Sequence, residues 1–128
     1  MKSLKDYRVY NNITFLIPVL AGIYSGELVF TILAVLILIG STFYHFCLVR
    51  RDRKIWPRVI DIVIASSCYI YLFYFATFRQ EESVQLPLYI ALASTILIFI
   101  IGKIFNSQKI HAVFHTSIAI AAAAVVLV

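Results

Sequence analysis

Few side chains in this sequence could carry chemistry, and their spacing suggests a metal site. His111 and His115 are four residues apart, so on a helix their imidazoles share one face and can hold one metal ion. Ser41 and His45 repeat this spacing, and Asp61 is the clearest carboxylate inside an apolar segment. Polar groups in such segments are costly to bury, so all five are candidates for function.

The combination of these residue types points to hydrolysis. Three histidines that leave a fourth coordination position open describe a catalytic zinc site, where the pKa of the bound water falls to about 7. Asp61 could be the general base or orient a ligating imidazole, and Ser41 could donate to a developing oxyanion. Simpler interpretations are packing histidines, a serine bonded to its own helix, Asp61 paired with Arg58, and a histidine pair serving haem or a proton relay.

The elements that must position these side chains are membrane-spanning helices. The chain has 128 residues, of which 62% are hydrophobic and 13% charged, against about 25% charged in soluble domains. Its mean hydropathy is +0.96. A chain this short cannot hide so much apolar surface from water. The composition therefore excludes a soluble globular enzyme, a disordered tail and a nucleic-acid module, and no nucleic-acid partner is expected.

Uncharged runs of membrane length predict about five transmembrane helices, since roughly 20 apolar residues cross the hydrocarbon core. The predicted helices cover residues 9–26, 28–49, 59–78, 84–102 and 110–128. Because each span must satisfy its own backbone hydrogen bonds, we expect an all-α integral membrane bundle in which residues 1–128 form a single multi-pass domain. Gly22 and Gly26 indicate a turn after the weak first segment. The alanines from Ala119 to Ala124 predict close helix contact.

The basic residues predict an orientation. In a five-helix topology, ten of the eleven Lys and Arg residues share one side, and Arg79 is alone on the other. The positive-inside rule then places the N-terminus in the cytoplasm and the C-terminus on the opposite side. The same topology gathers the histidines and Asp61 in one shallow cytoplasmic layer. The ten basic residues are Lys2, Lys5, Arg8, Arg50, Arg51, Arg53, Lys54, Arg58, Lys103 and Lys109.

Three short motifs resemble the CREST superfamily of membrane metal-dependent hydrolases, which includes alkaline ceramidases, progestin and adipoQ receptors and haemolysin-III-like proteins. The run Ser-Thr-Phe-Tyr-His-Phe-Cys at Ser41–Cys47 resembles the SxxxH motif. Its residue sequence is most similar to that of the myomaker and transmembrane-protein-eight branch. Asp61 resembles the aspartate early in the next core helix. The segment Lys109–His115 resembles the HxxxH motif that opens the last one.

The resemblance implies zinc held by His45, His111 and His115, with Asp61 and Ser41 beside the metal-bound water. It also implies a lipid amide hydrolase whose substrate is a membrane lipid. The family core usually has seven helices, so five helices would make this chain a shortened version. Losing two helices removes part of the wall of a lipid pocket, and a homodimer or a smaller substrate would compensate for that loss.

Three functions stay open at this point. The first is a zinc hydrolase that cleaves an amide or ester bond of a lipid at the cytoplasmic leaflet. The second is a non-enzymatic protein that remodels or organises the membrane around a structural zinc ion. The third is an ion or proton path, for which polar groups at only one end of the helices are poorly suited.

Overall fold

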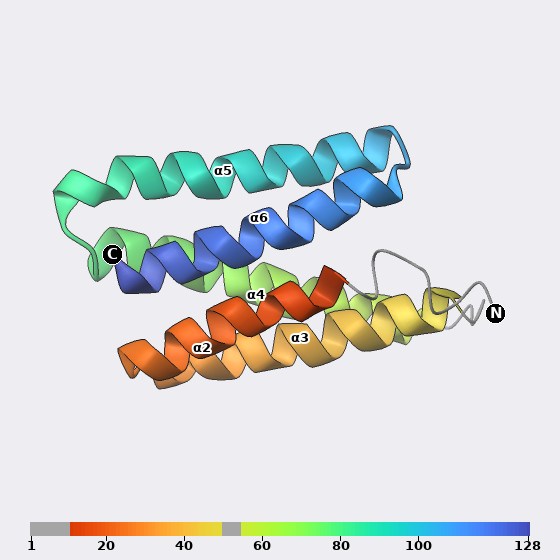
Figure 1. Cartoon of the computed structure of the whole chain (residues 1–128), viewed down its shortest axis with the longest axis horizontal. Coiled ribbons are helices and arrows are strands. Elements are labelled where there is room, and N and C mark those ends of the chain that lie inside the picture. The colour runs from red at the N-terminus through yellow and green to blue at the C-terminus, as the bar shows by residue number, and fades with distance from the viewer. Residues whose placement is uncertain (1–10, 50–54) are drawn as a thin grey trace.

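A computed structural model describes residues 11–49 and 55–128. These residues form a bundle of helices that lie side by side, and successive helices run in opposite directions (Figure 1). The predicted all-α fold is confirmed, since no strand occurs among the described residues. The elements are the 3₁₀-helix η2 (Asn11–Phe15) and the α-helices α2 (Leu16–Ser25), α3 (Leu28–Val49), α4 (Trp56–Phe78), α5 (Glu82–Ile104) and α6 (Gln108–Leu127).

Within the part of the chain that the structure describes, four helices are long and apolar enough to cross a membrane. The qualifying segments are Leu28–Phe46, Trp56–Phe78, Glu82–Ile104 and Gln108–Leu127. Their outer faces carry large apolar side chains, such as those of Ile39, Ile90 and Ile120, which are more than half exposed. Lipid suits such a surface and water does not. These features are those of an integral membrane protein.

The first predicted helix, over residues 9–26, is shorter in the structure than a membrane span. Its described part is the 3₁₀-turn η2 followed by α2, which has 10 residues and is therefore about 15 Å long. Two features accompany the late start of α2. The Asn12 side chain, in η2, donates a hydrogen bond to the Thr42 hydroxyl on α3. Pro18 lies in the first turn of α2, where its missing N–H costs no helical bond.

The turn between α2 and α3 depends on two glycines. Gly26 ends α2 with φ 73°, in the left-handed conformation that glycine adopts at helix ends, which confirms the predicted turn. Gly22 has a second role that the sequence did not reveal. A Cβ atom there would collide with the Thr31 hydroxyl and lie 2.9 Å from the Phe30 ring. The missing side chain therefore lets α2 pack closely on α3.

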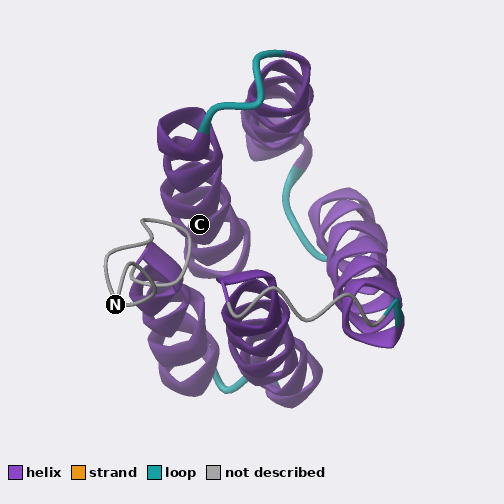
Figure 2. Cartoon of the chain, turned by 90° about the vertical axis from the view of Figure 1, so that its right-hand side faces the viewer, coloured by secondary structure: helices purple, strands orange, loops and turns teal. Residues whose placement is uncertain are grey.

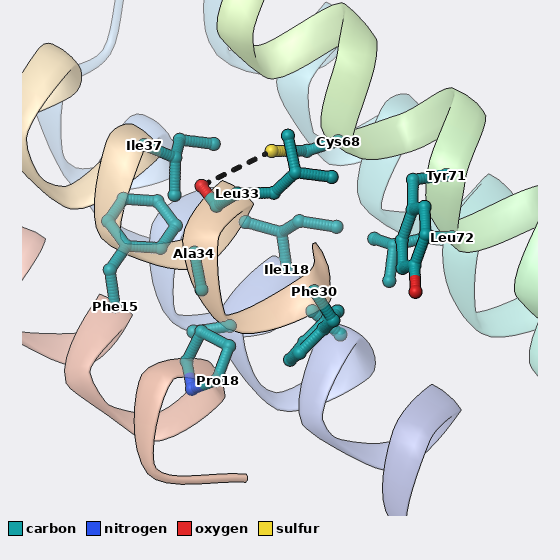
Figure 3. Close-up of a pocket in the computed structure, with 12 residues that line it drawn as sticks. Phe15, Pro18, Phe30, Leu33, Ala34, Ile37, Cys68, Tyr71, Leu72 and Ile118 are labelled. Carbon is teal, nitrogen blue, oxygen red and sulfur yellow. Dashed lines mark hydrogen bonds between the residues drawn. The ribbon is translucent and has the colours of Figure 1, made fainter. Parts of the chain in front are cut away.

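The core is centred on α6, the most buried of the four long helices. Ala119 is fully buried, and the alanines from Ala121 to Ala123 are nearly so, which confirms the predicted close contact. Figure 3 shows the apolar packing beside them. Phe15, Leu33 and Ile118, from three different elements, line a small cavity of about 30 Å³.

The two ends of the bundle differ in charge. The end that holds the α5–α6 turn and the start of α4 carries Arg58, Lys103 and Lys109 (Figure 1). At the other end, the Arg79 guanidinium pairs with the Glu27 carboxylate at 2.8 Å. The other seven basic residues lie outside the described part of the chain.

Candidate metal centre

Three histidines meet between α3 and α6. His45 comes from the C-terminal part of α3, and His111 and His115 come from successive turns near the start of α6. One ligand atom from each lies within 4.8 Å of the other two. The rings of His111 and His115 are 4.5 Å apart between centroids, as the i, i+4 spacing predicts. This cluster could hold a metal ion.

The distance between two of the three ligand atoms fits a single ion. A Zn–N bond is about 2.0–2.1 Å, so two nitrogen ligands of a tetrahedral site are about 3.4 Å apart. The Nε2 atoms of His45 and His111 are 3.4 Å apart. A direct hydrogen bond between the two rings is the alternative, but N–H donors in proteins usually lie about 2.9–3.0 Å from their acceptors. The separation is that expected for two ligands of one metal, and it is long for a hydrogen bond between the two rings.

The tight turn between α5 and α6 places His111. Ser107 caps α6, since its hydroxyl accepts a hydrogen bond from the Ile110 N–H at 3.3 Å. Asn106 before it adopts φ 47°, a left-handed conformation that asparagine tolerates. A Cβ atom on Gly102 would come within 3.3 Å of Ile110, so α5 and α6 are in close contact where α6 begins.

Aromatic rings surround the histidines and hold them in place. The ring of Phe15, from η2, lies 5.2 Å from that of His115, and Tyr44 lies 5.1 Å from His45. His45 and His115 are each only 3% exposed. Rings confined in this way lose little further freedom when they bind a metal, which favours affinity.

Ser41 is held by a residue that the sequence interpretation did not select. Its hydroxyl, one turn before His45, donates to the Asn12 side-chain carbonyl at 3.5 Å. The Asn12 amide group donates in turn to the Thr42 hydroxyl at 3.3 Å, and Asn12 is 1% exposed. Two successive asparagines in an apolar run were the available signal, because buried amides need partners.

All five predicted site residues line one cavity of about 470 Å³. Asp61 reaches it from α4, Ser41 and His45 from α3, and His111 and His115 from α6. Most of the other walls are apolar. In the end-on view of Figure 2, α3, α4, α5 and α6 are arranged around the middle of the bundle. The convergence expected from helix topology is thus present, whereas the roles of the five residues stay predictions.

A second cavity, of about 90 Å³, meets the histidines from the end of the bundle. Tyr44, Asn106 and Ser107 contribute to its walls, together with His45 and His111. The two histidines therefore line both cavities. The smaller cavity is lined mainly by polar residues, and the larger one mainly by apolar residues.

Comparison with protein-family models, curated proteins and solved structures finds no match to this chain. The likeness to the CREST superfamily accordingly stays a prediction from three short motifs. The residues that meet at the cavity have to be interpreted from their own chemistry.

Proposed function

We propose that this protein is a zinc-dependent membrane hydrolase that cleaves an amide or ester bond of a lipid. The observation that supports this most strongly is the three-histidine cluster in the wall of a cavity of about 470 Å³ that Asp61 and Ser41 also line. A metal position beside a ligand-sized cavity suits catalysis, because a purely structural zinc site is usually closed by four protein ligands.

Zinc is the metal that the ligand set favours. Imidazole suits zinc, copper, iron and nickel, and three histidines with an open position recur in catalytic zinc enzymes. The separation of 3.4 Å between His45 and His111 supports tetrahedral coordination. His45, His111 and His115 are therefore the proposed ligands.

The neighbouring side chains have two proposed roles, proton transfer and stabilisation of the carbonyl oxygen. When bound, zinc supplies a water of lowered pKa as the nucleophile. Asp61 would accept the proton of the nucleophilic water and would return it to the leaving amine or alcohol as the C–N or C–O bond breaks. Ser41 becomes a donor to the carbonyl oxygen by giving up its hydrogen bond to Asn12, and at 3.5 Å that bond is a weak one.

The cavity supports a lipid as the substrate. Its volume lies within the roughly 300–1,000 Å³ of small-molecule sites. Side chains such as Ile62, Ile96 and Phe114 form apolar walls between membrane-length helices. A lipid already in the bilayer could place its acyl chain there and its polar linkage at the histidines.

We place the basic end of the bundle in the cytoplasm, with the end of α6 on the opposite side. The support is the segregation of Arg58, Lys103 and Lys109 from Arg79. We expect a topology reporter fused after Val128 to be non-cytoplasmic, and one inserted after Asn106 to be cytoplasmic. A cytoplasmic signal from the Val128 fusion would contradict this orientation.

The hydrolase proposal is tested by turnover that depends on metal. Purified protein would be stripped with a chelator, reloaded with zinc, and incubated with a panel of lipid amides and esters, with mass spectrometry of the released acids. We expect zinc to restore hydrolysis of at least one lipid class. Fully zinc-loaded protein that hydrolyses none of them would favour the membrane-organising alternative.

A further inference from the structure

Two cations lie at the mouth of the large cavity. Arg58, near the start of α4, and Lys103, in the last turn of α5, both line it, and both side chains are exposed. They reach the cavity from two helices that touch each other only sparsely. The Lys103 ammonium group lies 5.4 Å from the centroid of the Phe99 ring, another part of the cavity wall. The charges therefore belong to the cavity and not only to the outer surface.

The depth of these cations matches that of lipid headgroups. Arg58 and Lys103 lie at the helix ends, next to the α5–α6 turn and the start of α4 (Figure 1). Long basic side chains at helix ends keep their charges at the membrane interface, where lipid phosphates lie. Trp56, half exposed and two residues before Arg58, suits the same level.

The cavity extends from this mouth towards the middle of the bundle. Deeper down, the hydroxyls of Tyr69 on α4 and Thr95 on α5 form a hydrogen bond of 2.8 Å that joins the two helices. Tyr69 lies eleven residues beyond Arg58, and Thr95 lies eight residues before Lys103, which is roughly 12–17 Å along a helix. The cavity wall includes Arg58, Lys103 and Tyr69, so its length suits part of one acyl chain.

The charges around the mouth favour an anion. Among the residues that the structure describes, the cavity wall holds two cations, Arg58 and Lys103, and one carboxylate, Asp61, one turn deeper than Arg58. A divalent ion on three neutral histidines would add further positive charge. Two cations beside an apolar chamber suit a lipid that carries a negatively charged headgroup on an apolar chain.

We propose that Arg58 and Lys103 form a headgroup subsite for the phosphate of an acyl lipid whose chain occupies the cavity between α4 and α5. This rests on the proposed lipid hydrolase, and it names the substrate class as a phosphate-bearing lipid. Arginine binds phosphate through two parallel N–H donors and lysine as a point charge, so the two residues suit opposite sides of one phosphate group.

The test measures lipid binding by the purified full-length protein in detergent, independently of turnover. Native mass spectrometry would compare three probes with the same oleoyl chain: lysophosphatidic acid, lysophosphatidylcholine and monoolein. Zinc content would be measured on each sample. The variants are Arg58→Gln, Lys103→Gln and their combination, with Arg58→Lys to retain the charge. Lys109→Gln is the matched control, since this exposed lysine lies at the same end of the bundle and outside both cavities.

We expect lysophosphatidic acid to bind about tenfold more tightly than monoolein, because hydrogen bonds between charged groups are strong. Each glutamine variant should lose most of this preference and keep monoolein binding. Arg58→Lys should retain part of the preference, because lysine keeps the charge but lacks the second parallel donor, and Lys109→Gln should retain it in full. Equal binding of all three probes by wild type, or a preference that survives in the double variant, would overturn the subsite. Competition by inorganic phosphate as effective as that of the lipid would also overturn it, because the site would then recognise phosphate alone. Wild-type protein that binds no zinc but still prefers lysophosphatidic acid would support the headgroup subsite and contradict the zinc hydrolase.

Discussion

Replacing His111 with alanine is expected to abolish stoichiometric zinc binding while the helical bundle stays folded. Wild-type protein should carry about one zinc ion per chain. A variant with two of the three ligands should lose more than the 10- to 100-fold in affinity that changes around a metal site typically cost. His111 is the best position for this test because its side chain is only partly buried, whereas His45 and His115 are each 3% exposed. Truncation there leaves the smallest defect in packing.

Metal content would be measured by plasma mass spectrometry after exchange into metal-free detergent buffer, and helicity by circular dichroism. Thr116→Ala is the matched control. Thr116 lies on α6 near the histidines, but its hydroxyl donates to the Ala112 carbonyl of its own helix at 3.3 Å and does not line the cavity. This variant should retain the zinc.

Two outcomes would contradict the metal centre. One is folded wild-type protein that binds no zinc. The other is equal zinc in wild type and in folded His111→Ala protein. In either case the separation of 3.4 Å between the His45 and His111 nitrogens would be a contact between two imidazoles. His45→Ala and His115→Ala should lose zinc as well, because each would leave only two ligands.

The convergence of the histidines was predictable because helix geometry is strict. The i, i+4 spacing of His111 and His115 places both rings on one face of any helix. His45 and Asp61 lie close to helix ends that are joined by a short connection, so antiparallel packing brings them to the same depth. Membrane-length apolar runs also predict the long helices, because few structures other than helices satisfy every backbone hydrogen bond in lipid.

Features that depend on how the helices pack together were not predictable in the same way. Hydropathy predicted a first helix long enough to cross the membrane. In the structure, η2 occupies part of this segment and places Asn12 against Ser41 and Phe15 against His115. Periodicity describes one helix at a time, so it cannot say where a short helix ends against its neighbours. The same limit applied to Arg58 and Lys103. The sequence suggested that both set the orientation and that Arg58 could pair with Asp61, whereas the structure places both cations at one cavity.

Replacing Asp61 with asparagine is expected to separate the hydrolase from the membrane-organising alternative. The amide has nearly the shape of the carboxylate but cannot accept the proton of the attacking water. Hydrolysis should therefore fall by the roughly 10²–10⁴-fold that a general base contributes. Zinc content should be unchanged, because the three ligands are histidines on α3 and α6 while Asp61 is on α4.

Ser66→Ala is the matched control for this change, since Ser66 is a polar residue of α4 that lines the same cavity and has no assigned role. Turnover of the lipid identified with wild type would be compared among the three proteins at equal zinc content. A loss confined to Asp61→Asn places the carboxylate in the proton transfer. Unchanged turnover by zinc-loaded Asp61→Asn would contradict that role, and a loss of zinc would show that the carboxylate supports the ligands instead. A purely structural metal site requires no proton acceptor. A loss of turnover in Asp61→Asn at unchanged zinc content therefore distinguishes a catalytic metal centre from a structural one.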